Sequence, residues 1–479
     1  MAPDPRDPLD LAAGAPLFAA YLRALERRGP GQYPMMTPGH KGRTDLTGAA
    51  VAGDAALSGG VDTVKLAHGY LLDAERRAAE LWGADFCRFS VSGSTHGNQA
   101  LALAVGHPGD EVVVSRTLHR SMLLGLVLAG LRPVWVRPRI DPATGLPAGV
   151  DAATVSEALR DHPRAVAVLV GDPSYVGTHS EIATLADVAH GAGVPLVVDA
   201  AWAAHFGFHP DLPPHALEAG ADALVTSAHK VLPAYSQAAI VLARTARLDP
   251  DRLGRAFEAT CTTSPAGQIL ASIDASRALL ERDGEKLAGQ MLDSVAAARR
   301  RLAAVPGLGV LEGPGVDPAK LAVVLAGVGA HGVAVEGDLM VSGCPVEMAD
   351  RDTITALVTM ADSPGDVEAF GEILARTIEA HRGAPRRIVP AASWTVQAEM
   401  VVTPREAFFA DAERVPAAAA VGRVSAELVA PYPPGIPVLA PGELVTAEAV
   451  DALSAAAADG IRIAYAADPT LRSLDVLRR

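Results

Sequence analysis

Between about residues 70 and 245, short apolar runs rich in Val, Leu and Ala alternate with segments of helical pattern. Apolar runs without alternating polar residues are typical of strands covered on both faces, and their alternation with helices predicts an α/β fold with a mostly parallel sheet. The expected strands are Phe86–Val91, Glu111–Ser115, Pro133–Val136, Ala165–Val170, Pro195–Asp199, Ala223–Thr226 and Ala238–Leu242. The expected helices are Ala74–Trp82, Gly97–Val105, Ser121–Gly130, Ala183–Ala192 and Pro214–Ala219.

Three segments are expected along the chain. Residues 1–60 form an N-terminal arm, which holds a helix over Leu17–Arg28 and a stretch rich in glycine and proline. Residues 61–290 form the large domain with the parallel sheet. Beyond a long helix over Lys286–Ala304, the pattern changes to short strands and helices, which predicts one or more smaller α+β domains over residues 291–479.

The composition excludes several classes of protein. With 41 Lys and Arg against 55 Asp and Glu, the net charge is −14, which argues against nucleic acid or an anionic membrane surface as a partner. Cys87, Cys261 and Cys344 are widely spaced without a C-x-x-C pair, so neither a disulfide framework nor a metal cluster is expected. The N-terminus does not resemble a signal peptide, and no apolar run reaches the ~20 residues of a membrane span. These features predict a soluble, cytoplasmic protein.

Lys230 follows the apolar run Ala223–Thr226 by four residues, in the segment Ser227-Ala228-His229-Lys230. Burial at a strand end would lower the pKa of its amine and make it a nucleophile that can form a Schiff base. Taken alone, an ordinary surface lysine in a loop between strand and helix is the better explanation.

Asp199 ends the apolar run Pro195–Asp199, 31 residues before Lys230. Open α/β sheets bind their ligands at the carboxyl ends of the strands. A carboxylate there can pair with a pyridinium nitrogen and keep it protonated, as pyridoxal phosphate (PLP) requires to act as an electron sink. The alternative is a carboxylate that caps a loop.

Two more segments lie between an expected strand and an expected helix. In Ser92–Asn98 (SGSTHGN), small residues and a helix N-terminus can cradle a phosphate, and the hydroxyls of Ser94 and Thr95 can add contacts. The alternative is a plain helix cap. In Ser115–Ser121, His119 could lie over an aromatic cofactor ring, although a structural histidine is favoured without that context.

Together and in this order, the four segments resemble the Orn/Lys/Arg decarboxylase family of PLP enzymes, whose fold is the fold-type-I (aspartate aminotransferase-like) fold. The chain is similar to the short members, which lack the N-terminal receiver-like domain of the large ones. Further similar segments cover most of residues 33–445: Thr37–Gly42 (TPGHKG), Gly171–Gly177, Asp199–Phe206 (DAAWAAHF), Thr262–Pro265 (TTSP), Pro404–Phe409 (PREAFF) and Tyr432–Pro437 (YPPGIP).

The resemblance implies a role for each matching residue. Lys230 would form the Schiff base, and Asp199 would pair with the pyridinium nitrogen. His119 would stack on one face of the PLP ring, with Ala201 on the other face and Trp202 beside the cofactor. The residues implied around the phosphate and the Schiff base are Gly93, Ser94, Thr95, Ser227 and His229. The expected catalytic residues are Lys230, His229 and His119, with Lys230 or His229 as the general acid that protonates the α-carbon.

The reaction implied by the resemblance is decarboxylation of a basic amino acid to its amine and CO₂, as in polyamine biosynthesis. Arginine is the first candidate substrate, and lysine or ornithine the next. Since fold-type-I sites are built across a subunit interface, a homodimer or a higher homo-oligomer is implied as well. The alternatives are a PLP-dependent aminotransferase, a decarboxylase of a specialised amino acid, and a catalytically silent relative that acts as a binding protein.

A long cationic substrate requires a carboxylate or carbonyl group at the distal end of the pocket. Asp62, Glu347, Glu427 and Glu443 are candidates, and the sequence does not distinguish them. Compared with the family pattern, Ala200 replaces the usual Glu after Asp199, and Ala266-Gly267 replace the frequent Ser-Tyr. These departures affect the periphery of the site, so they bear on the substrate more than on the cofactor.

Gly327–Gly332 reads G-x-G-x-x-G after a strand-like run, and Glu347 follows twenty residues after Gly327. This spacing matches the dinucleotide fingerprint and leaves an NAD site as a minor alternative. We expect no such site, because the segment lies in the C-terminal region without a surrounding series of βαβ units.

Overall fold

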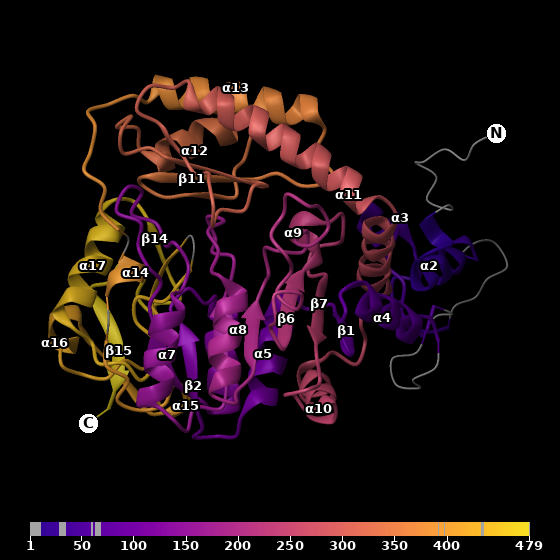
Figure 1. Ribbon diagram of the computed structural model, residues 1–479, viewed down its shortest axis with the longest axis horizontal. Helices are drawn as coiled ribbons and strands as arrows, with labels where there is room; N and C mark the ends of the chain where they lie inside the picture. Colours follow the sequence, from indigo (N-terminus) through magenta and orange to yellow (C-terminus); the bar gives the residue numbers. More distant parts are fainter. Residues whose placement is uncertain are drawn as a thin grey trace.

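The computed structural model describes residues 11–27, 35–58, 61–62, 69–390, 392–396, 398–432 and 435–478. A seven-stranded sheet stands in the middle of the molecule, and a four-stranded sheet with its helices lies above it (Figure 1). The C-terminal region, in yellow, packs on one side of the large sheet, and the N-terminal helices lie on the opposite side.

The large sheet has the strand order β1-β7-β6-β5-β4-β2-β3. Its strands are β1 (Phe86–Ser90), β2 (Glu111–Ser115), β3 (Arg132–Val136), β4 (Val168–Gly171), β5 (Leu196–Asp199), β6 (Ala223–Ser227) and β7 (Ala239–Ala243). β7 runs antiparallel to both of its neighbours, and the other neighbouring pairs are parallel. The predicted α/β fold with a mostly parallel sheet is thus confirmed.

Alternate residues of each strand enter two separate cores, which explains why the strands are apolar throughout. Val112 and Val114 of β2 pack under one layer of helices, whereas Val113 between them packs under the other. The first layer consists of α5 (Gly93–Val105), α6 (Arg120–Ala129) and α10 (Pro250–Thr260). The second layer includes α7 (Ala152–Asp161) and α8 (Ile182–Gly191).

One expected helix, over Pro214–Ala219, is wrong. The segment forms turns, with Leu217 buried and Gly220 at a φ of +102°. Six residues that begin next to Pro213 and end at a left-handed glycine give too few hydrogen bonds to nucleate a helix. The other helices expected in the large domain are present, with boundaries shifted by a few residues.

The four-stranded sheet is antiparallel and has the order β10-β11-β9-β8. Its strands are β8 (Gly309–Val310), β9 (Lys320–Val324), β10 (Met348–Ala349) and β11 (Thr353–Leu357), and its helices are α12 (Gly332–Val341) and α13 (Pro364–Ala380). The 37-residue helix α11 (Gly267–Ala303) leads to it from the large sheet and packs along α13. This helix begins 19 residues before the expected start at Lys286.

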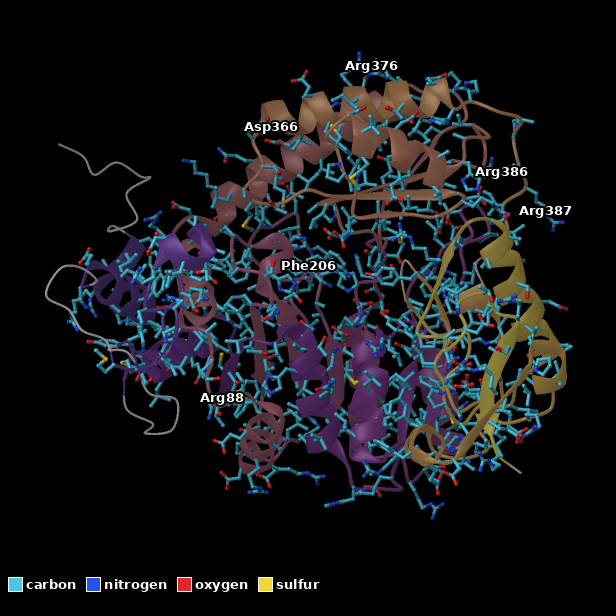
Figure 2. All side chains as sticks on the ribbon, turned by 180° about the vertical axis from the view of Figure 1, so that it is seen from behind. Arg88, Phe206, Asp366, Arg376, Arg386 and Arg387 are labelled. Atoms are coloured by element: carbon cyan, nitrogen blue, oxygen red, sulfur yellow. The ribbon has the colours of Figure 1, made fainter. Side chains whose placement is uncertain are left out.

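Figure 2 shows the reverse side, where Asp366 and Arg376 project outward from α13 and Phe206 lies in the interior.

The G-x-G-x-x-G segment follows β9, whose neighbours are both antiparallel, so it is not part of a βαβ unit. A Cβ on Gly327 or Gly332 would overlap a backbone carbonyl oxygen, so these glycines allow close packing of the chain on itself.

The C-terminal region forms a core of its own, which includes Val429, Leu453 and Val476. Its helices are α14 (Ala392–Thr395), α15 (Pro404–Phe409), α16 (Ala417–Ala420) and α17 (Ala447–Ala458). Its two-stranded sheets pair β12 (Ala412–Pro416) with β15 (Ser473–Leu477) and β13 (Ala430–Tyr432) with β14 (Arg462–Ala464). None of the helices in the described part of the chain combines the length and the apolar composition that crossing a bilayer requires.

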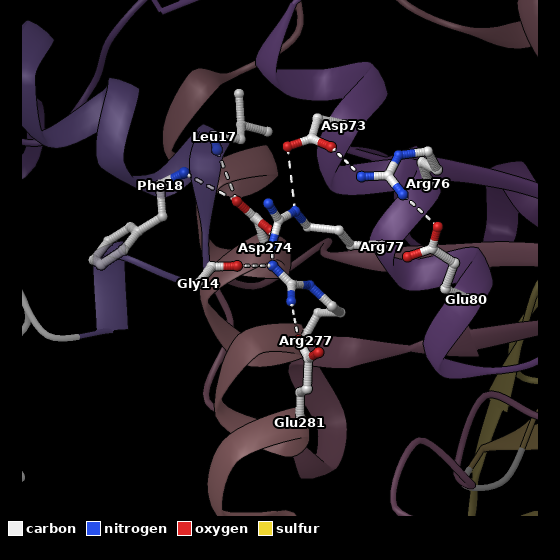
Figure 3. A network of polar contacts seen from close by, with 10 residues as sticks. All are labelled: Gly14, Leu17, Phe18, Asp73, Arg76, Arg77, Glu80, Asp274, Arg277 and Glu281. Atoms are coloured by element: carbon white, nitrogen blue, oxygen red, sulfur yellow. Dashed lines mark hydrogen bonds and ion pairs between the residues drawn. The ribbon is translucent and has the colours of Figure 1, made fainter.

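The N-terminal helix α2 (Pro16–Glu26) is attached to α11 by a buried carboxylate (Figure 3). Oδ2 of Asp274 accepts hydrogen bonds from the backbone N–H groups of Leu17 at 2.8 Å and Phe18 at 3.2 Å. Oδ1 accepts from Arg277 at 2.7 Å, and Arg277 also donates to the Gly14 carbonyl. Asp274 therefore caps the N-terminus of α2 from another helix. The expected end of this helix, Arg28, lies outside the described residues. The other elements before the large sheet are α3 (Thr44–Thr47), a 3₁₀ turn at Ala49–Val51 and α4 (Tyr70–Leu81).

We expect Asp274→Asn to lower the free energy of unfolding by about 2 kcal/mol, because it removes a charge that the hydrogen bonds from Leu17, Phe18 and Arg277 require. Denaturant titration measures this loss, and limited proteolysis should show faster cleavage around α2. Glu285→Gln, at an exposed position of the same helix, is the matched control. Equal stability of the two variants would contradict the anchoring role of Asp274.

Candidate active site

A cavity of about 470 Å³ lies at the carboxyl ends of β5 and β6, where parallel α/β sheets bind their ligands. All ten residues that the sequence analysis singled out for the cofactor line it: Gly93, Ser94, Thr95, His119, Asp199, Ala201, Trp202, Ser227, His229 and Lys230. The structure thus brings together residues from four strand ends (β1, β2, β5 and β6) that are up to 137 residues apart in the chain, counted from Gly93 to Lys230. Their individual roles remain predictions.

Lys230 lies on the short helix α9 (Ala228–Val231), directly after β6. Burial lowers the pKa of its amine to about 8, although the carboxylates of Asp199 and Glu347 oppose that shift. A lysine with this pKa is in part neutral near pH 7–8, so its amine can act as a nucleophile. Its Nζ lies 3.6 Å from the centre of a Trp202 ring, so the indole holds the amine from one side.

Asp199, the last residue of β5, is buried and held in a fixed orientation. Oδ2 accepts a hydrogen bond of 2.6 Å from the side-chain amide of Asn98, and Oδ1 accepts one of 3.2 Å from the Ala201 N–H. The same amide group of Asn98 also donates to Ser121 Oγ at 2.8 Å. Asn98 was not singled out by the sequence analysis, although it closes the SGSTHGN motif.

The network continues from Ser121 to His119, the N-cap of α6. Nδ1 of His119 lies 2.9 Å from Ser121 Oγ and accepts a hydrogen bond of 3.2 Å from the Ser121 N–H. An accepting Nδ1 places the ring proton on Nε2, and the ring is neutral. Burial, together with the charges of Lys230 and Arg120, lowers the pKa of His119, while Asp199 opposes the shift. His119 therefore presents an uncharged aromatic ring to the cavity.

His229, beside Lys230, has its Nδ1 2.8 Å from the Ala238 carbonyl oxygen, to which it donates a hydrogen bond. This leaves Nε2 as an acceptor, and burial lowers the pKa of the ring. The neutral form is therefore favoured, and a neutral His229 cannot itself donate a proton from Nε2. Of the two general acids considered from the sequence, Lys230 is the better supported.

Also in the lining of the cavity, the hydroxyl oxygens of Ser94 and Ser227 lie 2.7 Å apart. Gly93 begins α5 with a φ of +70°, and no heavy atom lies within 4 Å of the position that a Cβ would take. The Ser92 side chain does not cap α5, and the Gly93 N–H donates to the Gln237 carbonyl oxygen at 2.8 Å, which leaves the N–H groups of Ser94 and Thr95 in the first turn for a ligand. This part of the cavity is suited to a phosphate group, because it combines two hydroxyls, a helix N-terminus and free space beside a glycine.

These groups fit PLP in kind. A buried carboxylate is suited to the pyridinium nitrogen, a neutral imidazole to the ring face, a hydroxyl-lined helix N-terminus to the phosphate, and an amine of lowered pKa to the aldehyde carbon. When bound, PLP supplies an electron sink for a bond at the α-carbon of an amino acid.

Of the four candidates for the distal carboxylate, Glu347 is the one that lines this cavity. Its Oε1 accepts a hydrogen bond of 2.9 Å from the Tyr175 hydroxyl. Glu443 pairs with Arg116, Glu427 accepts from the backbone N–H groups of Ala467 and Asp475, and Asp62 accepts from that of Leu71. Those three carboxylates have structural partners elsewhere, so Glu347 is the candidate that the cavity favours.

The C-terminal region also reaches the cavity, through Tyr432 and Ile436 of the YPPGIP segment. Within the described residues, the lining includes neither Thr37–Gly42 nor Thr262–Pro265, although both belong to the family resemblance. The sequence analysis did not connect Tyr175 with Glu347, because Tyr175 follows β4 and Glu347 precedes β10, and the two meet only in the folded chain.

Solved structures identify the class of the fold. Lysine decarboxylase A from Pseudomonas aeruginosa superposes with a TM-score of 0.81 at 20% identity, over 98% of this chain and 81% of that one. A structure of SPT with PLP superposes with a TM-score of 0.54 at 16% identity, over 77% of this chain and 85% of that one. The fold is therefore that of fold-type-I PLP-dependent enzymes, as predicted from the sequence.

The sequence comparisons are more specific. The family model for the major domain of Orn/Lys/Arg decarboxylases matches residues 16–333, and the model for their C-terminal domain matches residues 389–458. The arginine decarboxylase of Halalkalibacterium halodurans is 31% identical over 97% of both chains. The chain belongs to the Orn/Lys/Arg decarboxylase family, so the predicted family and the prediction of an enzyme are confirmed.

Proposed function

We propose that this protein catalyses the PLP-dependent decarboxylation of a basic amino acid, with arginine as the first candidate and lysine or ornithine as the next. The observation that carries the proposal is one cavity that holds both the amine of Lys230, with its lowered pKa, and the carboxylate of Glu347. The first group suits covalent attachment of the cofactor, and the second suits a cationic side chain. The name of the Halalkalibacterium halodurans relative supports arginine.

In this proposal, Asp199 keeps the pyridinium nitrogen of PLP protonated, and Asn98 holds Asp199 in position. His119 and Ala201 would hold the two faces of the ring, while Gly93, Ser94, Thr95, Ser227 and His229 would surround the phosphate and the Lys230 amine. Glu347, oriented by Tyr175, binds the distal cationic group of the substrate. Lys230 then returns a proton to the α-carbon after CO₂ has left.

A homodimer is also part of the proposal. The segments Thr37–Gly42 and Thr262–Pro265 are largely exposed and lie away from this chain's own cavity. In a dimer, they are free to reach the cavity of the second subunit. A cytoplasmic location and a place in polyamine biosynthesis remain predictions from the sequence.

The test is to supply the purified protein with PLP and to measure CO₂ and amine from arginine, lysine and ornithine in turn. We expect one of the three to give equal amounts of CO₂ and the corresponding amine. Formation of a 2-oxo acid without CO₂ would instead support an aminotransferase, and no reaction with any of the three would support a decarboxylase of a specialised amino acid or the silent relative.

Glu347→Gln should lower kcat/KM for the basic substrate by about 10²-fold, because the variant loses a charge-assisted contact with the cationic group. Steady-state kinetics measures this, and the visible absorbance of bound PLP should be retained. Glu368→Gln, at an exposed position of α13, is the control. An unchanged kcat/KM in Glu347→Gln would contradict the role given to this carboxylate.

A further inference from the structure

A second buried lysine lies against the same indole as Lys230. Lys320 is the first residue of β9, in the four-stranded sheet, and the residue is 4% exposed. Its Nζ lies 3.8 Å from the centre of a Trp202 ring, and Nζ of Lys230 lies 3.6 Å from the centre of that residue's ring. No described residue gives Nζ of Lys320 a hydrogen bond. The indole of Trp202 is thus the main group that contacts the charged amine of Lys320.

The surrounding chain holds Lys320 in this place. A Cβ on Gly177 would lie 2.7 Å from both Cβ and Cγ of Lys320, so the glycine makes room for the lysine stem. The Arg299 guanidinium donates hydrogen bonds to the carbonyl oxygens of Lys320, at 2.6 Å, and of Asp317, at 3.1 Å. Backbone and stem are therefore fixed, and the ammonium group is directed at Trp202.

The nearby anions have other partners. Asp317 Oδ1 lies 3.1 Å from Nε2 of buried His205 and accepts a hydrogen bond of 2.9 Å from the Ala319 N–H. Glu347 accepts its hydrogen bond from Tyr175, whose ring centre is 5.8 Å from Nζ of Lys320. Asp317 and Glu347 attract the Lys320 ammonium at a distance, while Lys230 repels it.

A lysine at this position destabilises the folded state. A buried ammonium without hydrogen bonds costs several kcal/mol, and the residues that follow in β9, Leu321–Val324, are all apolar. A leucine or methionine would satisfy the packing without that cost. Buried charges of this kind, next to a reactive group in a cavity, are typical of functional sites.

We propose that Lys320 is a positioning residue for the nucleophilic amine: its ammonium group fixes the indole of Trp202 and, as a like charge, favours the neutral form of Lys230. The inference rests on the proposed function, in which Lys230 attaches the cofactor. Burial, with repulsion by Lys230, lowers the pKa of Lys320 to about 8, against the attraction of Asp317 and Glu347. Two such neighbouring amines share their protons, so the charge on one depends on the other.

The test is the pH dependence of acetylation of Lys230 by acetic anhydride, measured by peptide mass spectrometry on the full chain before PLP is added. In Lys320→Met, loss of the like charge should move the midpoint for Lys230 to higher pH by about one unit. Lys320→Arg, which keeps the charge, should leave it near the wild-type value. Lys286→Met removes an exposed lysine from α11 and should have no effect.

The PLP-loaded protein provides a second measurement. The pH at which its visible absorbance changes should rise in Lys320→Met and not in Lys320→Arg. An unchanged acetylation midpoint in a folded Lys320→Met protein, or an equal rise in Lys320→Arg, would overturn the proposal. Should Lys320→Met not fold, Lys320→Gln takes its place with the same expectations. Absence of PLP binding would overturn the proposed function but leave the acetylation measurement valid for Lys320.

Discussion

Replacing Lys230 by alanine is expected to lower kcat/KM for decarboxylation by about 10⁴-fold or more. The variant loses both the amine that would attach the cofactor and the proposed proton donor to the α-carbon. The indole of Trp202 packs on this amine, and Lys320 of β9 lies on the same residue as a second amine. The near-ultraviolet and visible spectrum should lose its Lys230-dependent band at the same time.

Lys286→Ala, the same change at an exposed position of α11, is the matched control and should keep both activity and spectrum. Lys230→Ala should unfold at a temperature close to that of the wild type, because removal of a partly charged buried amine relieves a desolvation cost. Substantial CO₂ release by folded Lys230→Ala would refute the role of this lysine. Failure of the wild-type protein to develop the band with added PLP would refute the PLP assignment.

Glu443→Ala is expected to destabilise the protein by about 3–5 kcal/mol, the usual cost of leaving a buried ionic partner uncompensated. Glu443 accepts hydrogen bonds from Arg116 at 2.6 and 3.0 Å and from the Ala440 N–H at 2.7 Å. The two side chains are 1% and 5% exposed, and the Arg116 guanidinium also lies over the Trp135 ring. Since Arg116 directly follows β2, the pair attaches the C-terminal region to the large sheet.

Denaturant titration of the wild type and the variant measures the loss. The control is Glu372→Ala, which breaks the exposed pair of Arg301 and Glu372 between α11 and α13 and should cost less than about 1 kcal/mol. Similar losses in the two variants would contradict the idea that the buried pair holds the C-terminal region in place. Because Glu443 does not line the cavity, any effect of its replacement on catalysis should follow from the displacement of Tyr432 and Ile436.

The sequence predicted the large sheet and brought together residues that line one cavity, because both depend on local patterns. Apolar runs mark strands, and strand ends that carry Asp199 or Lys230 meet at one edge of a parallel sheet. The reversed direction of β7 could not be predicted in this way, since an apolar run has the same pattern in either orientation. The helix over Pro214–Ala219 was wrong because its pattern was too short to override the adjoining turns.

The residues from the four-stranded sheet were harder to find. Glu347, which directly precedes β10, was one of four candidate carboxylates, and its place in the cavity beside Tyr175 distinguishes it. Lys320 also adjoins an apolar run, but it stands at the beginning of the run, whereas Lys230 follows its run. A lysine before a strand was not a signal that the sequence analysis used. The spacing of residues along the chain does not indicate which residues of the four-stranded sheet will face the large sheet.

The helix α11 has a consequence for how this chain can change in length. Its 37 residues form a continuous rod of about 55 Å, which is fixed to α2 near one end and packs along α13 towards the other. One inserted residue in such a rod would turn everything beyond it by about 100°. The number of residues in α11 thereby sets which side of the four-stranded sheet faces the cavity. The positions of Lys320 and Glu347 therefore depend on the length of a helix to which neither residue belongs.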